Sequence, residues 1–178
     1  MFTLENFIHE NTMRQLDIDA IMVVQSGKTL GFECIGRPAL HNVFSVAKTF
    51  TVTGIGMAVD AGLLHLSDKP VDCFEGLFSE NTDPRWQNVT LEHLLTMTFG
   101  HGAAHMMAAE RKYLRSETDK AMSEAVKNEW LRYAFACPMV YEPGEHFCYG
   151  NLAPYVAGRM LEKVTGMSIR DYLFKKFW

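Results

Sequence analysis

Residues 49–59 contain no charged side chain, and this run constrains the fold more than any other feature of the sequence. Its threonine, valine and glycine residues give it a poor intrinsic helix propensity. Gly62 follows at a position typical of the residue just beyond a helix. We therefore expect a central helix over residues 45–61 that is stabilised by burial on most of its sides.

Size and composition predict one soluble globular domain. The chain has 178 residues, of which 48% are hydrophobic and 21% charged. A formal net charge of -4 gives no basic surface for nucleic acid. The N-terminus lacks the basic start and apolar run of a signal peptide, and no stretch has the length of a membrane span. We expect a cytoplasmic protein with no nucleic-acid or membrane partner.

The four cysteines, Cys34, Cys73, Cys137 and Cys148, form no C-x-x-C pair and have no metal-ligand spacing. A chain of this length with so few cysteines does not resemble a disulfide scaffold. We expect reduced thiols.

Local patterns predict an α+β organisation. Residues 20–25 and 28–35 are β-prone runs around a Ser26-Gly27 turn, which predicts a hairpin. Two strands are too few for a stable sheet, so either strands are missing or the hairpin leans on helices. The expected helices lie at 2–14, 91–99 with Thr90 as N-cap, 116–136, 152–165, and from Ser168 onward.

Ser45 and Lys48 are the strongest candidates for chemistry. A spacing of three places the hydroxyl and the amine on one helix face, one turn apart. Lys48 opens an otherwise uncharged helix, where an ammonium either pairs with an anion or loses its proton, and both suit activation of a hydroxyl. The alternative is that Ser45 is a helix cap and Lys48 a surface residue, since short motifs often arise by chance.

Three blocks in order carry a resemblance to a known family. They are H-N-V-F-S-V-A-K with its helix and sequel at 41–71, V-T-L-E-H-L-L-T-M-T-F-G at 89–100, and P-G-E-H-F-C-Y-G-N with V-T-G beyond it at 141–173. Together they resemble serine β-lactamases and penicillin-binding proteins. The similarity is greatest to the class C β-lactamase-related serine hydrolases of the esterase and 6-aminohexanoate-dimer hydrolase type.

The resemblance implies roles for four residues. Ser45 would be the acylated nucleophile and Lys48 its proton acceptor and electrostatic partner. Tyr149 would act as general base toward Ser45 and then as general acid toward the leaving group. Asn151 would bind the substrate's carbonyl or amide, and Lys48. No cofactor is implied, and the substrate would be a small ester, amide or β-lactam.

The third element of that family, a Lys-Thr-Gly or His-x-Gly on a later strand, does not follow Asn151. We therefore expect a partial β-lactamase/transpeptidase-like fold: one incomplete domain over 1–178, with a helix and hairpin at 1–44, an active-site helix at 45–62 and a helical region at 63–178. The C-terminal sheet strands would be missing, and the chain alone would be incomplete as a catalyst. The alternative function is a non-catalytic binding or sensor module.

Two further features are a histidine pair and an aromatic C-terminus. His101 and His105 have the i, i+4 spacing of zinc ligands, but the intervening residues lack a zincin glutamate and no third ligand is indicated, so we expect no metal. Tyr172, Phe174, Phe177 and Trp178 form an aromatic C-terminus. These aromatics or the exposed sheet edge offer a route to self-association.

Overall fold

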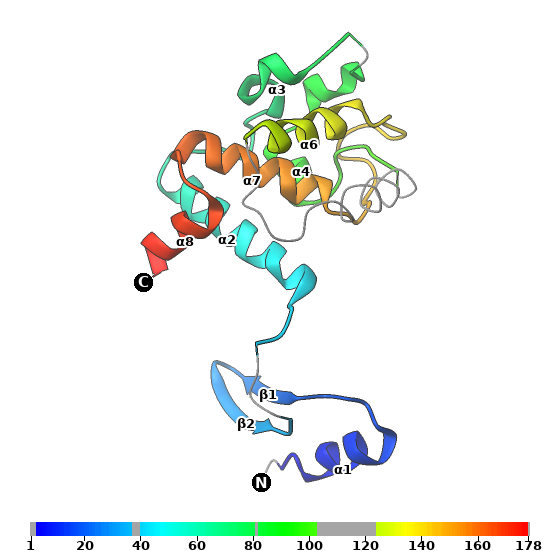
Figure 1. Ribbon diagram of the computed structural model, residues 1–178, viewed down its shortest axis with the longest axis vertical. Helices are drawn as coiled ribbons and strands as arrows, with labels where there is room; N and C mark the ends of the chain where they lie inside the picture. The colour runs from blue at the N-terminus through cyan, green and yellow to red at the C-terminus, as the bar shows by residue number, and fades with distance from the viewer. Residues whose placement is uncertain (1–2, 37–39, 81, 103–123, 178) are drawn as a thin grey trace. The chain divides into compact units, whose positions relative to one another are not determined.

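In the computed structural model, residues 3–36, 40–80, 82–102 and 124–177 are described (Figure 1). The chain divides into two compact units, Met1–Val43 and Phe44–Trp178. Part of the helix expected at 116–136 lies outside the described residues, and its described part is α6, Glu124–Ala136.

The first unit consists of one helix and one hairpin. Helix α1 spans Glu5–Arg14, and strands β1, Ala20–Gln25, and β2, Lys28–Cys34, pair antiparallel with a register shift after Val23. The buried Asn11 links α1 to the segment before β1, because its side-chain amide both donates to the carbonyl of Ile18 and accepts from the Ile18 N–H. The predicted hairpin is confirmed.

The second unit is helical in its described residues. Its elements are η1 (Phe44–Val46), α2 (Ala47–Asp60), α3 (Pro70–Cys73), η2 (Glu75–Leu77), η3 (Pro84–Asn88), α4 (Leu91–Leu95), α6, α7 (Leu152–Thr165) and α8 (Ile169–Phe177). Helix α7 is central: it contacts α2, α3, α4, α6 and α8, and Figure 1 shows it crossing the middle of the unit. None of the described helices has both the length and the apolar content that a bilayer crossing requires.

The expectation that α2 is buried on most sides is wrong for the described structure. Only Gly54, Ile55 and Ala58 are buried, whereas Phe50 and Val52 are 51% and 45% exposed. The helix packs one face against α7 and α8. Its apolar composition therefore exceeds what this single contact face uses.

Helix α4 is shorter than the expected 91–99. Thr90 is the N-cap as predicted, and its hydroxyl accepts from the His93 N–H while His93 Nδ1 accepts from the Thr90 N–H. The helix ends at Leu95 because Met97 takes a left-handed backbone conformation, φ 56°, that an α-helix cannot continue through.

The core of the second unit is aromatic. Trp86, Phe99 and Phe135 are fully buried, and Phe78 stacks on Phe135 with ring centroids 4.1 Å apart. Trp86 meets Phe135 edge-on with ring centroids 4.9 Å apart, an arrangement that the quadrupoles of the two rings favour. A helical unit and a two-stranded sheet confirm the α+β class.

Candidate active site

Ser45 lies in the 3-10 turn that leads into α2. Phe44, immediately before it, has φ 45°, a left-handed conformation that bulky residues rarely adopt. Lys48 is in the first turn of α2, and its Nζ donates to Ser45 Oγ over 3.0 Å. The predicted proximity of the hydroxyl and the amine is present.

Asn151 brings a distant segment to the same amine. Lys48 Nζ donates to Asn151 Oδ1 over 2.5 Å. Asn151 is the N-cap of α7, yet its side chain makes no cap hydrogen bond. The carbonyl oxygen that would ordinarily cap α7 is therefore directed to Lys48 instead.

Tyr149 reaches this group from the loop before α7. Lys48 Nζ lies 5.0 Å from the centroid of the Tyr149 ring, within cation–π range. The neighbours Cys148 and Gly150 are buried, whereas Tyr149 is 54% exposed. Ser45, Tyr149 and Asn151 are thus gathered around the amine of Lys48, the fourth residue predicted for the site.

Arg85 supports the loop that carries Tyr149, a contact that was not among the predictions from the sequence. Its guanidinium donates to the Met139 carbonyl over 2.6 Å and to the Tyr141 carbonyl over 3.4 Å. Hydrogen bonds from Arg85 hold the pKa of Asp83 down to about 2, and Asp83 in turn raises the pKa of Arg85. The Asp-Pro start of η3 was the available signal, because Asp83 Oδ1 accepts from the Arg85 N–H as a cap.

The histidine pair does not define a metal site in the described residues. His101 is fully buried against Trp86 and Phe99, with ring centroids 5.6 and 4.4 Å away. His105 lies outside the described residues. Within the part of the chain that is described, no three His, Cys, Asp or Glu side chains gather to hold a metal ion.

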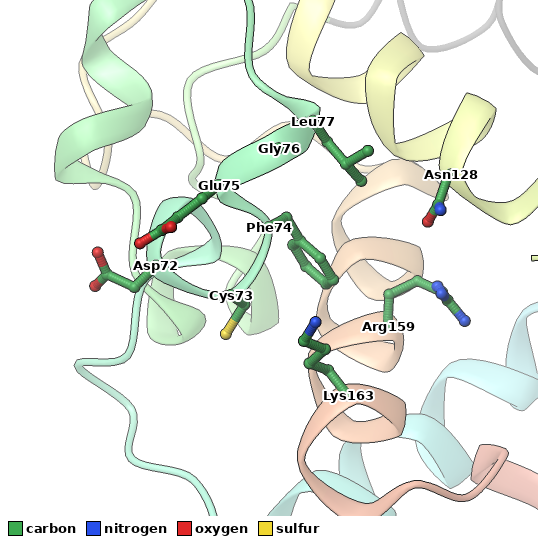
Figure 2. Close-up of a pocket in the computed structure, with 9 residues that line it drawn as sticks. All are labelled: Asp72, Cys73, Phe74, Glu75, Gly76, Leu77, Asn128, Arg159 and Lys163. Atoms are coloured by element: carbon green, nitrogen blue, oxygen red, sulfur yellow. The ribbon is translucent and has the colours of Figure 1, made fainter.

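A cavity of about 520 Å³ lies apart from Ser45, between η2 and the helices α6 and α7. Figure 2 shows Asp72 and Glu75 on one of its sides and Arg159 and Lys163 on the other. Arg159 also pairs with Glu162 on its own helix. Since none of the predicted site residues lines this cavity, it is not part of the candidate active site.

Comparison with known proteins gives the class of this chain. The protein-family model described as Beta-lactamase matches residues 8–178. The chain belongs to the beta-lactamase family. The resemblance predicted from the three sequence blocks is confirmed at this level.

Individual relatives are similar at a low level of identity. Monacolin J acid methylbutanoyltransferase of Aspergillus terreus is 28% identical over 116 residues, which cover 65% of this chain and 27% of the relative. Penicillin-binding protein 4* of Bacillus subtilis is 25% identical over 145 residues, 76% of this chain and 27% of the relative. The octameric penicillin-binding protein homologue from Pyrococcus abyssi superposes with a TM-score of 0.71 at 25% identity, over 97% of this chain and 41% of that one.

The chain therefore spans about a quarter of the length of these curated relatives and less than half of the similar solved structure. The family, the α+β fold and a relationship to acyl-transferring proteins follow from the comparisons. Octameric assembly is a property of the Pyrococcus protein.

Proposed function

We propose that this chain carries the nucleophile of a serine acyl-transfer enzyme, and that Ser45 forms a covalent acyl-enzyme. The observation that supports it is the convergence on Lys48: its Nζ lies 3.0 Å from Ser45 Oγ, 2.5 Å from Asn151 Oδ1 and 5.0 Å from the Tyr149 ring centroid. A nucleophile and a proton-accepting group within hydrogen-bond reach, with the second group held by a third, is the arrangement that covalent catalysis needs.

In the first half of the reaction, Ser45 Oγ attacks the carbonyl carbon of an ester or amide. The hydroxyl proton passes to the Lys48–Tyr149 pair while the Oγ–C bond forms. Collapse of the tetrahedral intermediate breaks the bond to the alcohol or amine, and Tyr149 donates a proton to that leaving group. The leading turn of a helix, where Ser45 lies, leaves backbone N–H groups without intrahelical partners, and these favour a nearby oxyanion.

In the second half, an acceptor attacks the acyl group on Ser45. With water as the acceptor, the C–Oγ bond breaks, the acid is released and Ser45 regains its proton. With an alcohol as the acceptor, the product is a new ester. The name of the Aspergillus relative describes transfer of a methylbutanoyl group, so an acceptor other than water is the second candidate for this chain. The substrate class remains a short ester, a linear or D-amino-acid amide, or a β-lactam.

The family match runs from residue 8 to residue 178 and so includes both compact units. We therefore propose that 1–178 forms part of a single β-lactamase-like domain. In this family a backbone N–H of a later strand also binds the oxyanion. Residues other than Ser45, Lys48, Tyr149 and Asn151 would have to supply that donor. Such a donor contributes about a hundred- to thousandfold in rate to acylation and deacylation alike, because both steps pass through a tetrahedral oxyanion.

The test is covalent labelling. The chain is incubated with a fluorophosphonate, and the modified peptide is identified by mass spectrometry. We expect a single label at Ser45, abolished by Ser45→Ala and retained in Ser67→Ala, which alters an exposed serine of the same unit. Well-folded protein that takes up no label would favour the binding or sensor module instead.

Matched variants separate the two proton-handling residues. Lys48→Met is expected to slow labelling strongly, whereas Lys163→Met, an exposed lysine of α7, is expected to leave it unchanged. Tyr149→Phe keeps the ring over Lys48 and removes only the hydroxyl, so labelling should fall by about a hundredfold or more. Tyr141→Phe, on the same loop, is the control. Equal labelling rates in Tyr149→Phe and Tyr141→Phe would remove Tyr149 from the mechanism.

A further inference from the structure

Residues 97–100, which follow α4, lie against the loop that carries Tyr149, and backbone hydrogen bonds join the two segments. Three carbonyls of residues 97–100 accept from four N–H groups of the loop: Met97 O from Cys148 N at 2.9 Å, Thr98 O from Gly144 N at 2.7 Å, and Gly100 O from Val140 N at 2.9 Å and Tyr141 N at 3.1 Å. Both ends of the loop are therefore positioned by a few residues from another part of the sequence.

Met97 makes the contact closest to the site. The N–H that its carbonyl receives belongs to Cys148, which directly precedes Tyr149. The direction of this carbonyl depends on the left-handed conformation of Met97, φ 56°. A non-glycine residue in this region costs about 1 kcal/mol or more and persists only where its surroundings hold it.

Burial explains why a backbone contact matters here. Cys148 is 8% exposed and faces the core, so its side chain and its N–H together fix the backbone just before the tyrosine. Tyr149 itself is 54% exposed, so core packing restrains its side chain only in part. Where the backbone of Cys148 is held therefore contributes to the location of the Tyr149 ring over Lys48.

We propose that Met97 is a positioning residue for Tyr149, acting through its carbonyl and its left-handed backbone rather than through its side chain. The inference rests on the proposed function for its consequence on rate. Met97 does not touch the reacting groups and takes no part in proton transfer.

The test compares residues by their tolerance of a left-handed backbone. Glycine and asparagine adopt it readily, whereas a β-branched residue does not. We expect Met97→Gly and Met97→Asn to label with fluorophosphonate within about threefold of the parent chain. Met97→Val should label about ten- to a hundredfold more slowly, because a displacement near 1 Å at a reacting group has effects of this size.

Met167→Val is the matched control, because Met167 is also partly buried against the same core and has no left-handed backbone. It should label like the parent chain. If Met97→Gly slows labelling as much as Met97→Val does, the side chain and not the backbone is responsible, and the proposal fails.

A second readout is independent of activity. The chain is produced with 3-fluorotyrosine, and the Tyr149 resonance is assigned by its absence in Tyr149→Phe. Since Lys48 Nζ lies 5.0 Å from the ring centroid, Lys48→Met should shift the Tyr149 fluorine resonance. That shift should disappear in the Met97→Val background and persist in the Met97→Gly background.

The two readouts distinguish the two proposals. The parent chain could fail to be labelled and still show the Lys48-dependent fluorine shift, with that shift lost only in the Met97→Val background. This result would contradict the proposed function and support the positioning role. A shift that persists in Met97→Val would overturn the positioning role, whatever the labelling result.

Discussion

Asn151 at the start of α7 accepts a 2.5 Å hydrogen bond from Lys48 in the first turn of α2, across 103 positions of sequence. This bond fixes one direction of the ammonium, and the bond to Ser45 Oγ fixes a second. The two contacts hold the amine beside the proposed nucleophile.

Replacement of Asn151 should therefore change the position of the Lys48 amine more than it changes the stability of the fold. Asn151→Ala removes the acceptor, and we expect fluorophosphonate labelling to slow by about ten- to a hundredfold, the cost of one hydrogen bond to a charged group. Asn151→Asp restores an oxygen at the same place and should recover most of the rate. Asn88→Ala, an exposed asparagine at the end of η3, is the control, and a similar loss in that variant would contradict the assignment.

The ion pair of Asp83 with Arg85 predicts an acid-dependent stability. The pKa of Asp83 in the folded chain is about 2, below its ordinary value of 3.8, mainly because Arg85 donates to it. A depressed pKa contributes stability that is present above about pH 4 and is lost as the pH falls toward 2. Asp83→Asn keeps the oxygen that accepts from the Arg85 N–H and removes the charge.

Urea unfolding from pH 2 to pH 7 measures this contribution. The parent chain should exceed Asp83→Asn by about 1–2 kcal/mol near neutral pH, after allowance for solvent screening, and the difference should shrink toward pH 2. Glu129→Gln alters an exposed carboxylate of α6 and should show no such pH-dependent difference. A difference that stays constant over the whole range would show that charge is not its origin.

Gly100 should not tolerate a side chain. Its φ is +101°, and a Cβ built there would lie 2.7 Å from the carbonyl oxygen of Tyr141, a backbone atom that cannot move cheaply. We expect Gly100→Ala to lower the free energy of unfolding by about 2–4 kcal/mol, from backbone strain and steric clash together. Gly166→Ala isolates the strain, since φ is +66° there with open space around the added methyl. Equal losses of unfolding free energy in the two variants would mean that the close approach of the Tyr141 carbonyl oxygen does not contribute to the destabilisation.

The four thiols should react in an order set by their exposure. Cys34 is exposed and should be alkylated first by iodoacetamide at pH 8. Burial, followed by the charges of Asp68 and Asp72, raises the pKa of the Cys73 thiol and so reduces its reactive thiolate. Burial also raises the pKa of Cys137.

Mass spectrometry over time should thus find Cys34 modified in minutes, Cys73 later, and Cys137 and Cys148 only after unfolding. In urea all four should react together. Rapid modification of Cys148 in the native chain would contradict the burial that the positioning role of Met97 depends on.

Local patterns were sufficient for the hairpin, for the existence of the longer helices and for the Ser45–Lys48 pair, but they did not predict α3 or the 3-10 helices. A spacing of three on a helix brings two side chains together whatever surrounds them, and the hairpin followed from a β-prone run on each side of Ser26-Gly27. The arrival of Tyr149 at Lys48 did not follow from spacing. It was implied only by the family resemblance, and the contact is present in the structure.

The remainder depends on contacts that no local pattern encodes. Helix α4 ends early at a methionine, where no glycine or proline predicts an end. The left-handed backbone of Met97 is held by a hydrogen bond from the Cys148 N–H, about fifty residues later in the sequence. His93 completes the cap of α4 at a position where glutamate or glutamine is the usual signal. Arg85 reaches two carbonyls of that same loop, and a guanidinium gives no hint in the sequence of which carbonyls it will meet.

The hydrogen bonds between residues 97–100 and the tyrosine loop join main-chain N–H groups, which every residue type except proline possesses, to main-chain carbonyls, which all residue types possess. Mutational drift at Thr98, Val140 or Cys148 can therefore alter packing while the pairing partners stay in place. In a saturation library, proline should be the uniformly rejected residue at the four donor positions, 140, 141, 144 and 148. The Tyr149 phenol can therefore keep its position while many of the surrounding residues are substituted.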